Sequence, residues 1–392
     1  MSNNYDVLIV GGGVMGCATA YYLLKADPNL TVAILEKDAT YAKASTPLSD
    51  GNMRIQFNLK ENIQISQYGL EVVKAFAEEM GVDDDRPDPA FRQQGNLFVW
   101  DEAGREEAYQ GFRLQKQLGC AINWLTPDEV QRAYPLYDLK DCAAGTLGPL
   151  DGTMSPMAIL LGYKKKVVAL GARFIEAEVA TLLKANNQIT GVQLASGERL
   201  YSQCILNAAG AWAPQVAATI GVTLPIAPTK RQVTIFETNI RPAKRLPALF
   251  FPSGLYLMHE DEGVFMCGKS FPDDYIGYDD FTWERKRFET AVWPELVEYI
   301  PAFDRLKVLH GWAGLYEVNT LDGNAILGEW PEVKGFYLAN GFSGHGFQQC
   351  HAVGRYIAEL MLAQSSTLDL AIFSPQRILE NKPVFESRRK LI

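Results

Sequence analysis

Three glycines near the start of the chain, Gly11, Gly13 and Gly16, have the spacing of a phosphate-binding turn. The first glycine of such a turn permits a tight bend, the second lets the backbone approach a pyrophosphate, and the third lets the following helix pack closely on the preceding strand. An apolar run at residues 7–10 precedes the turn, and a helical run at residues 17–24 follows it. Because the free N–H groups at a helix N-terminus attract phosphate, this order predicts a nucleotide-binding site.

Glu36 stands 20 residues after Gly16, at the end of the next apolar run, residues 31–35. A carboxylate at this place accepts hydrogen bonds from the hydroxyls of a nucleotide ribose, and it disfavours a 2′-phosphate and hence NADP. A third apolar strand, residues 203–207, ends in small residues and can return to the same sheet. The long stretch of other residues before this strand favours an FAD protein over an NAD dehydrogenase, whose two nucleotide-binding halves are contiguous.

A second glycine-rich turn, residues 341–346, connects a short strand at residues 337–340 to a helix that begins at Phe347. Apolar residues recur at helical spacing along the segment that follows, which supports the helix. We expect the N-terminus of this second helix to face the same ligand as the first. Both ends of the chain would then converge on one cofactor.

The chain resembles the D-amino-acid-oxidase superfamily of FAD-dependent amine and amino-acid oxidoreductases. The similar branch contains glycine oxidase, monomeric sarcosine oxidase, the sarcosine oxidase β subunit and dimethylglycine dehydrogenase. The resemblance spans nearly the whole chain and is carried by residues 11–16, 207–212, 312–314 with 322–323, and 341–347. Within the branch, residues 60–66 and 312–314 are most similar to an FAD-dependent oxidoreductase domain-containing assembly factor of mitochondrial complex I.

The resemblance implies an α/β fold of the glutathione-reductase-like, D-amino-acid-oxidase type, in which a Rossmann-type FAD-binding domain is interleaved with a second, sheet-rich substrate domain. We expect the FAD-binding domain to comprise residues 1–80, 156–215 and 309–392, and the substrate domain to comprise residues 81–155 and 216–308. Periodicity in the sequence agrees with this division. It predicts helices at residues 61–80, 106–118 and 283–299, a hairpin around Ser196-Gly197, and alternating strands over residues 228–269.

The same resemblance implies which residues contact FAD. Ser45, Thr46, Gly51 and Asn52 would lie beside the pyrophosphate and flavin, and the backbone at Val179 would hold the adenine. The helix after residue 346 would point at the pyrimidine edge of the isoalloxazine, where its dipole stabilises the negative charge of reduced flavin. The complete expected set is Gly11, Gly13, Val14, Met15, Gly16, Glu36, Lys37, Ser45, Thr46, Gly51, Asn52, Val179, Ala208, Gly210, Trp212, Gly314, Gly344, His345, Gly346 and Phe347.

We expect the FAD to be held without a covalent bond. Monomeric sarcosine oxidase attaches its flavin through a cysteine, and the matching position of this chain is Leu315. The histidine attachment site of the dimethylglycine type falls at Phe57 or Asn58. Neither position offers a side chain that could form the bond.

Family chemistry implies oxidation of an amine: a hydride leaves the carbon next to nitrogen for flavin N5, and the resulting imine hydrolyses. The arginine that grips the substrate carboxylate in glycine oxidase is replaced by Leu315 or Tyr316, and the sarcosine oxidase lysine is replaced by Gln348. Arg54 is therefore the best remaining cation, with Lys230 and Arg231 as alternatives and Tyr256, His259 and Tyr316 as polar or aromatic walls. The expected catalytic set is Arg54, Tyr256, Lys269, Tyr316 and His345.

The electron acceptor is left open between oxygen and a protein or quinone. The lysine that activates oxygen in sarcosine oxidase corresponds to Met266, and Lys269, three residues later, is expected to face the other side of its strand. The leading hypothesis is oxidation of a secondary or tertiary amino acid of sarcosine or dimethylglycine type. The alternative is a flavoprotein assembly factor or interaction protein in which FAD is mainly structural.

Composition narrows the class of protein. A net charge of −9 and the lack of a basic stripe argue against nucleic-acid binding. The chain contains no run of 18 apolar residues, so the sequence predicts no transmembrane segment. The N-terminus does not resemble a presequence. Six scattered cysteines and four histidines without metal-ligand spacing indicate free thiols and no metal site. We therefore expect a cytoplasmic protein, with peripheral membrane contact left open by the cluster Arg388-Arg389-Lys390.

Overall fold

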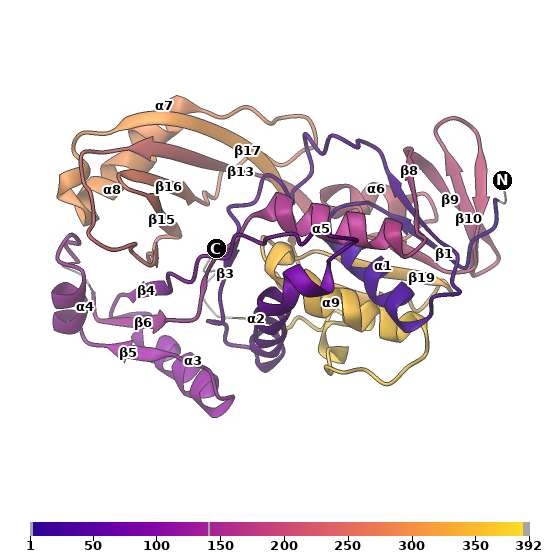
Figure 1. The fold of residues 1–392 in the computed structure, drawn as a ribbon, viewed down its shortest axis with the longest axis horizontal. Coiled ribbons are helices and arrows are strands. Elements are labelled where there is room, and N and C mark those ends of the chain that lie inside the picture. Colours follow the sequence, from indigo (N-terminus) through magenta and orange to yellow (C-terminus); the bar gives the residue numbers. More distant parts are fainter. Residues whose placement is uncertain (1–2, 140–141, 387–392) are drawn as a thin grey trace.

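The structure is a computed structural model that describes residues 3–139 and 142–386. Two lobes lie along the long axis of the molecule (Figure 1), one around a six-stranded sheet and the other around an eight-stranded sheet. The basic cluster at residues 388–390 lies outside the described residues. Within the described ranges, no helix is long and apolar enough to cross a bilayer. In the same ranges, no three metal-ligating side chains gather in one place.

The six-stranded sheet contains the strands that the glycine motifs predict. Its order is β18-β19-β12-β1-β2-β8, and every neighbouring pair is parallel except β18 with β19. The third predicted strand thus returns beside the first, as β12 next to β1. The strands are β1 (Val7–Val10), β2 (Val32–Glu36), β8 (Arg173–Glu176), β12 (Ile205–Asn207), β18 (Ile326–Glu329) and β19 (Phe336–Asn340).

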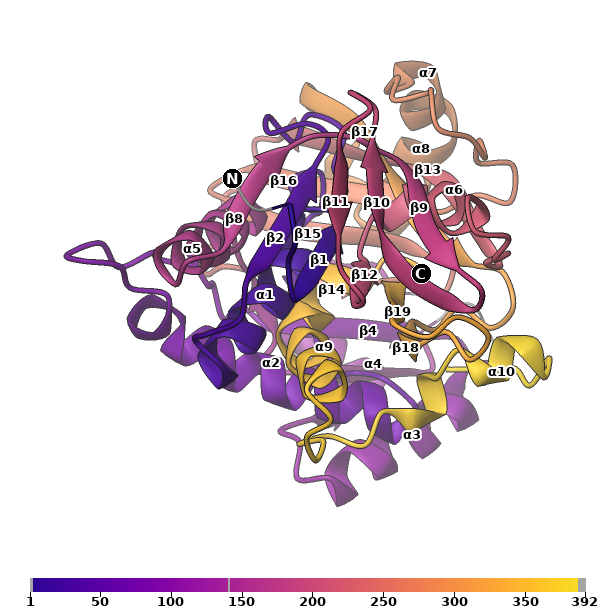
Figure 2. The same ribbon diagram turned by 90° about the vertical axis from the view of Figure 1, so that its right-hand side faces the viewer.

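Both faces of this sheet are covered, which explains why its strands read as continuous apolar runs. On one face Ile9 and Ile34 pack against helices, and on the other Leu8 and Leu35 pack against a three-stranded antiparallel sheet (Figure 2). The helices are α1 (Val14–Ala26), α2 (Lys60–Glu79), α5 (Pro156–Ala169) and α9 (Gly346–Met361), and the smaller sheet is β9 (Val179–Ala185), β10 (Gln188–Leu194) and β11 (Arg199–Tyr201).

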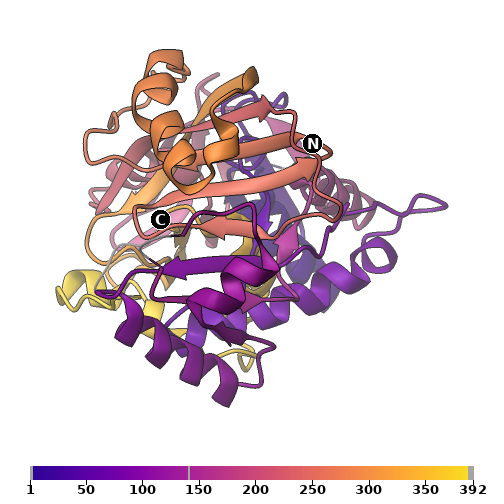
Figure 3. The ribbon, with the colours of Figure 1, turned by 90° about the vertical axis from the view of Figure 1, so that its left-hand side faces the viewer.

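The eight-stranded sheet forms the second lobe, in the order β17-β13-β16-β15-β14-β4-β6-β5. Helices cover one of its faces (Figure 3), where Leu296 and Phe288 pack on the strands. The opposite face presents Phe98, Phe250 and Tyr256 toward the other lobe. The strands are β4 (Asn96–Trp100), β5 (Asn123–Leu125), β6 (Ala144–Gly148), β13 (Ile226–Glu237), β14 (Ala248–Phe250), β15 (Leu255–Asp261), β16 (Val264–Lys269) and β17 (Lys307–Asn319).

Shorter elements complete the chain. The helices of the second lobe are α3 (Arg105–Gln117), α4 (Pro127–Ala133), α7 (Arg285–Arg287) and α8 (Trp293–Tyr299), with a π-helical turn at Phe288–Val292 and a 3-10 turn at Pro301–Phe303. Elsewhere lie α6 (Ala213–Ala218), α10 (Gln376–Leu379), 3-10 turns at Gly210–Trp212 and Ala371–Phe373, and the two-stranded sheet of β3 (Asn52–Met53) and β7 (Gly152–Thr153).

The predicted fold class is confirmed: a Rossmann-type α/β sheet is interleaved with a second, sheet-rich lobe. The predicted domain boundaries stay a prediction, and one of them needs revision. Strand β17 pairs with β13 along most of its length, so residues 309–319 extend the eight-stranded sheet although they were assigned to the FAD-binding domain. We propose the boundary after Asn319. The long strand was not predicted because Gly311 and Gly314 interrupt the alternation of segment 307–319 and read as turns in the sequence.

Candidate active site

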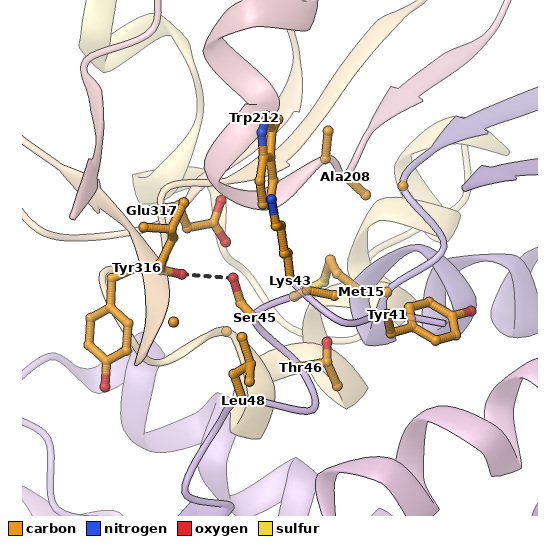
Figure 4. A pocket seen from close by; sticks show the side chains of 18 of the residues that line it. Met15, Tyr41, Lys43, Ser45, Thr46, Leu48, Ala208, Trp212, Tyr316 and Glu317 are labelled. Atoms are coloured by element: carbon orange, nitrogen blue, oxygen red, sulfur yellow. Dashed lines mark hydrogen bonds between the residues drawn. The ribbon is translucent and has the colours of Figure 1, made fainter. Parts of the chain in front are cut away.

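A cavity of about 780 Å³ lies where the two lobes meet. Its walls come from the loops that follow β1, β2 and β12, from the N-terminus of α9, and from strands β13, β15, β16 and β17 of the second lobe. Figure 4 looks into this cavity and shows Tyr41 and Met15 at the opposite side of the view from Tyr316. The volume is within the range of small-molecule and cofactor sites.

The first glycine turn forms one wall of the cavity, and each glycine serves a different purpose. Gly11 has φ of +106°, and a β-carbon there would lie 2.3 Å from the carbonyl oxygen of Ala208. A β-carbon on Gly16 would lie 2.1 Å from the carbonyl oxygen of Gly11, so the helix packs directly on the turn. A β-carbon on Gly13 would meet only the Thr46 hydroxyl at 3.5 Å. The backbone at Gly13 is therefore open to a ligand at the N-terminus of α1.

Glu36 lies behind this turn at the end of β2. Its two carboxylate oxygens accept hydrogen bonds from the N–H groups of Gly12 at 2.8 Å and Asp38 at 3.0 Å. Because each oxygen can accept more than one hydrogen bond, the carboxylate keeps capacity for ribose hydroxyls. Nearby, the ammonium of Lys37 lies 3.6 Å from the centre of the Trp212 ring, and the two side chains wall this end of the cavity.

The second glycine turn lies at the other end and is held by β17. Glu317 accepts a hydrogen bond from the N–H of Gly341 at 2.9 Å, and its backbone carbonyl accepts another from Ser343 at 3.1 Å. Burial raises the pKa of Glu317 to about 8, although the N–H groups of Gly341 and Phe342 oppose the shift. The Ser45 hydroxyl donates to the carbonyl of Leu315 at 2.8 Å (Figure 4). The bonds from Gly341 and Ser343 fix the turn that precedes α9 to β17, and the bond from Ser45 joins the loop after β2 to the same strand.

Arg54 occupies a small side cavity next to the main one. Its side chain is 8% exposed, and the guanidinium lies between 5.0 and 5.7 Å from the ring centres of Phe57, Phe98 and Phe250. Its Nη2 lies 2.9 Å from Nε2 of His345, and its Nε has no hydrogen-bond partner. Burial lowers the pKa of Arg54. Within the described ranges, no carboxylate lies within ion-pair distance of this guanidinium.

The other predicted cations are already paired with carboxylates. Lys230, an alternative cation in the sequence, is buried between Asp280 and Glu284, at 2.6 and 2.7 Å. Arg231 lines the main cavity but pairs with Asp274 at 2.6 Å. The ammonium of Lys269 pairs with Glu295.

His259 was expected to form a wall of the site and does not. Its Nδ1 accepts a hydrogen bond from the N–H of Leu246 at 3.1 Å, and its Nε2 lies 2.8 Å from the carbonyl of Glu262. The ring stacks on Phe265. The side chain therefore serves the turn between β15 and β16, away from the residues that line either cavity.

Most predicted cofactor and catalytic residues gather around the two cavities. Tyr256 and Tyr316 line both, Lys269 lines the main cavity, and Arg54, Asn52 and His345 line the side cavity. Gly16 and Gly51 line neither, because both support the turns from behind. The predicted residues on the main cavity are Gly11, Gly13, Val14, Met15, Glu36, Lys37, Ser45, Thr46, Val179, Ala208, Gly210, Trp212, Gly314, Gly344, Gly346 and Phe347.

Sequence reasoning missed three polar residues of the site. Tyr41 donates its hydroxyl to the carbonyl of Gly12 at 3.1 Å, and Glu317 and Asp50 both line the main cavity. Glu317 stands two residues after Leu315, so the two-residue period of a strand could have placed it beside the cavity. Asp50 directly precedes Gly51, which was assigned to the site, but no pattern distinguished its carboxylate from that of a surface loop.

The fold and the site define a class: a two-lobed dinucleotide-binding oxidoreductase in which the cofactor lies between the lobes. Comparison with known proteins agrees. The family described as "FAD dependent oxidoreductase" (DAO) matches residues 6–360, and the chain belongs to this family. The resemblance inferred from the motifs is confirmed, and the protein is an FAD-dependent oxidoreductase.

Three relatives illustrate the similarity. FAD-dependent oxidoreductase domain-containing protein 1 of Bos taurus is 34% identical, over 94% of this chain and 83% of its own length. Sarcosine oxidase subunit beta of an Arthrobacter species is 27% identical, over 95% and 91%. The crystal structure of L-proline dehydrogenase from P. horikoshii superposes with a TM-score of 0.86 at 26% identity, covering 98% of this chain and 100% of that one.

The cavity fits the FAD that the family binds. The open backbone at Gly13 and the N-terminus of α1 suit a pyrophosphate, and the spare lone pairs of Glu36 suit a ribose. The N-terminus of α9, at Gly346 and Phe347, suits the electron-rich edge of a flavin. Among the described residues that line the main cavity there is no cysteine, and Leu315 stands where a thioether would form.

We predict that the flavin leaves the protein on denaturation. Trichloroacetic acid should give a colourless pellet and a yellow supernatant, because Leu315 and Phe57 or Asn58 stand at the two positions where the resemblance places covalent attachment. The measurement is the absorbance of both fractions near 450 nm, with a covalent flavoprotein treated in parallel as the control. Yellow colour that stays in the washed pellet contradicts the prediction.

Proposed function

We propose that the protein oxidises the C–N bond of a secondary or tertiary amino acid, of sarcosine or dimethylglycine type, to an imine that then hydrolyses. The observation that carries this proposal is Arg54, a buried guanidinium without a carboxylate partner among the described residues, beside the cofactor cavity. A buried cation is costly unless it is paired, so a substrate carboxylate is its natural partner. Sarcosine and proline, which name two of the relatives, are both secondary amines that carry a carboxylate.

The residues around the side cavity would orient such a substrate. FAD, when bound, accepts the hydride from the carbon next to nitrogen. Arg54 would hold the carboxylate, with His345 beside the guanidinium, and the rings of Tyr256 and Tyr316 would close the space between the two cavities. Burial raises the pKa of Tyr316 to about 12, so its phenol stays neutral and donates hydrogen bonds at ordinary pH. The protein supplies position and a dry surrounding, and the cofactor supplies the chemistry.

The runner-up is a flavoprotein that assists assembly of another protein, with FAD mainly structural. Its support is the 34% identity to FAD-dependent oxidoreductase domain-containing protein 1, which exceeds the identity to the enzymes named above. A screen of N-methyl, cyclic and D-amino acids for anaerobic bleaching of the flavin near 450 nm separates the two. Bleaching by any compound supports the enzyme, and bleaching by none favours the assembly protein.

Replacing Arg54 should remove most of this activity. We expect Arg54→Gln to lower kcat/KM for the best amine of the screen by at least roughly 30-fold, as is typical when a buried charged partner of a carboxylate is lost. Arg54→Lys keeps the charge and should recover part of the loss. The matched control is Arg113→Gln on the exposed face of α3. If Arg54→Gln and the control have equal kcat/KM values and full FAD content, Arg54 does not bind the substrate.

The electron acceptor is proposed to be a protein or quinone rather than oxygen. Lys269 is the only lysine of the expected catalytic set, and its ammonium is engaged by Glu295. We expect the reduced protein to react with air more slowly than it turns over with an artificial acceptor such as dichlorophenolindophenol. Anaerobic reduction followed by stopped-flow mixing with air measures this rate. Reoxidation as fast as turnover would identify an oxidase.

We also propose that the protein works in the cytoplasm. All six cysteines are free thiols, four of them buried, which suits a reducing compartment.

A further inference from the structure

We propose that the carboxylate of Asp50 binds the amino group of the substrate and thereby selects amino acids over carboxylic acids that lack a nitrogen. The inference deepens the proposed function and rests on it. It assigns a specificity-determining residue that no motif indicates, on the loop between Glu36 and β3. Asp50 and Arg54 would then form two opposite charges for the two ends of a zwitterion.

The position of Asp50 is the first observation. Asp50 is one of six described residues that line both the main cavity and the side cavity, with Ser49, Tyr256, Tyr316, Gly344 and Phe347. A ligand whose carboxylate reaches Arg54 and whose reacting carbon lies in the main cavity must pass this junction. The amino group, one bond from the reacting carbon, is then at the level of Asp50.

The second observation is that the carboxylate is fixed and poor in partners. One oxygen accepts a hydrogen bond from the N–H of Asn52 at 3.1 Å, and Tyr256 lines the same junction of the two cavities. Within the described ranges, no lysine, arginine or histidine lies within ion-pair distance of Asp50. Burial raises the pKa of this carboxyl, against the opposing effect of Arg54. A substrate ammonium would supply the missing cation and offset the cost of burying the charge.

The third observation is that the Tyr256 ring, which lines the same junction as Asp50, is held in place by packing. Its ring lies over Gly268 of the neighbouring strand, where a β-carbon would come within 2.4 Å of the phenolic oxygen. The ring can occupy this place only because Gly268 has no side chain. The Tyr256 hydroxyl is thereby held near Asp50 at the junction of the two cavities. The pKa of Tyr256 is raised well above its ordinary value by burial, so the phenol remains a donor.

The test compares pairs of ligands that differ only at the nitrogen. The pairs are sarcosine with methoxyacetate and L-proline with tetrahydro-2-furoate, in which an ether oxygen replaces the amine. Dissociation constants are measured on the FAD-loaded protein from the change in flavin absorbance, under anaerobic conditions for the amines. For Asp50→Asn we expect the amine of the pair to bind at least roughly tenfold more weakly. The ether should bind as before or more tightly, since it loses an unfavourable neighbour.

Matched variants separate this role from a general disturbance of the site. Asp50→Glu keeps the charge and should preserve the preference for the amine to within about threefold, which corresponds to less than about 0.7 kcal/mol. Arg54→Gln should weaken both members of each pair, because both carry the carboxylate. If Asp50→Asn does not retain FAD, Asp50→Ser is used for the same comparison.

Several results would overturn the inference. If Asp50→Asn weakens the binding of amine and ether equally, or weakens neither, Asp50 does not recognise the substrate nitrogen. Loss of FAD in both Asp50→Asn and Asp50→Ser shows that the carboxylate serves the fold. If no amine bleaches or perturbs the flavin of the wild-type protein, and the Asp50 variants behave in the same way, both the proposed function and this inference are wrong. The first two results leave the proposed function standing, so the two failures are distinguishable.

Discussion

The cofactor cavity depends on a close backbone contact between the first glycine turn and the end of β12, where no side chain separates the two segments. The β-carbon that Gly11 lacks would lie 2.3 Å from the carbonyl oxygen of Ala208, and the one that Gly16 lacks would lie 2.1 Å from Gly11 itself. This contact joins parts of the chain almost 200 residues apart. Between β1 and β12 the chain also builds β2, β8 and the helices of the same lobe, and it leaves that lobe once, after α2, to form β4, β5 and β6 of the second lobe before it returns at α5.

Much of this could be predicted from sequence because it is local. The strand, turn and helix around Gly13 and the turn before Phe347 carry their conformational requirements in their own glycines, so both were found. What sequence could not give is the pairing of charges across the fold. Lys230 was an alternative to Arg54 in the sequence, but it is neutralised by Asp280 and Glu284, which lie 50 and 54 residues away in the chain. Such partners become neighbours only through the packing of strands and loops, as does the meeting of Asp50 with Tyr256.

The ion pairs of the cations around the cavity indicate at which end a substrate carboxylate can bind. Cations that line the main cavity from the second lobe, Arg231 and Lys269, are each neutralised by an acidic residue of the same lobe. Among the cations predicted to contact substrate, Arg54 alone has no ion pair within the described residues, and it lies in an aromatic surrounding that strengthens any interaction with an anion.

Strand β17 has a mechanical consequence. It is paired with β13 over nearly its full length, while its last residues are bonded to the turn at residues 341–346 through Glu317, and the N–H of Asn319 donates to the Ser343 hydroxyl at 3.0 Å. The single strand β17 is thus hydrogen-bonded to elements of both lobes. The lobes cannot swing apart about a hinge at this point without breaking those bonds. A disturbance of the eight-stranded sheet is therefore carried through β17 to the turn that precedes α9.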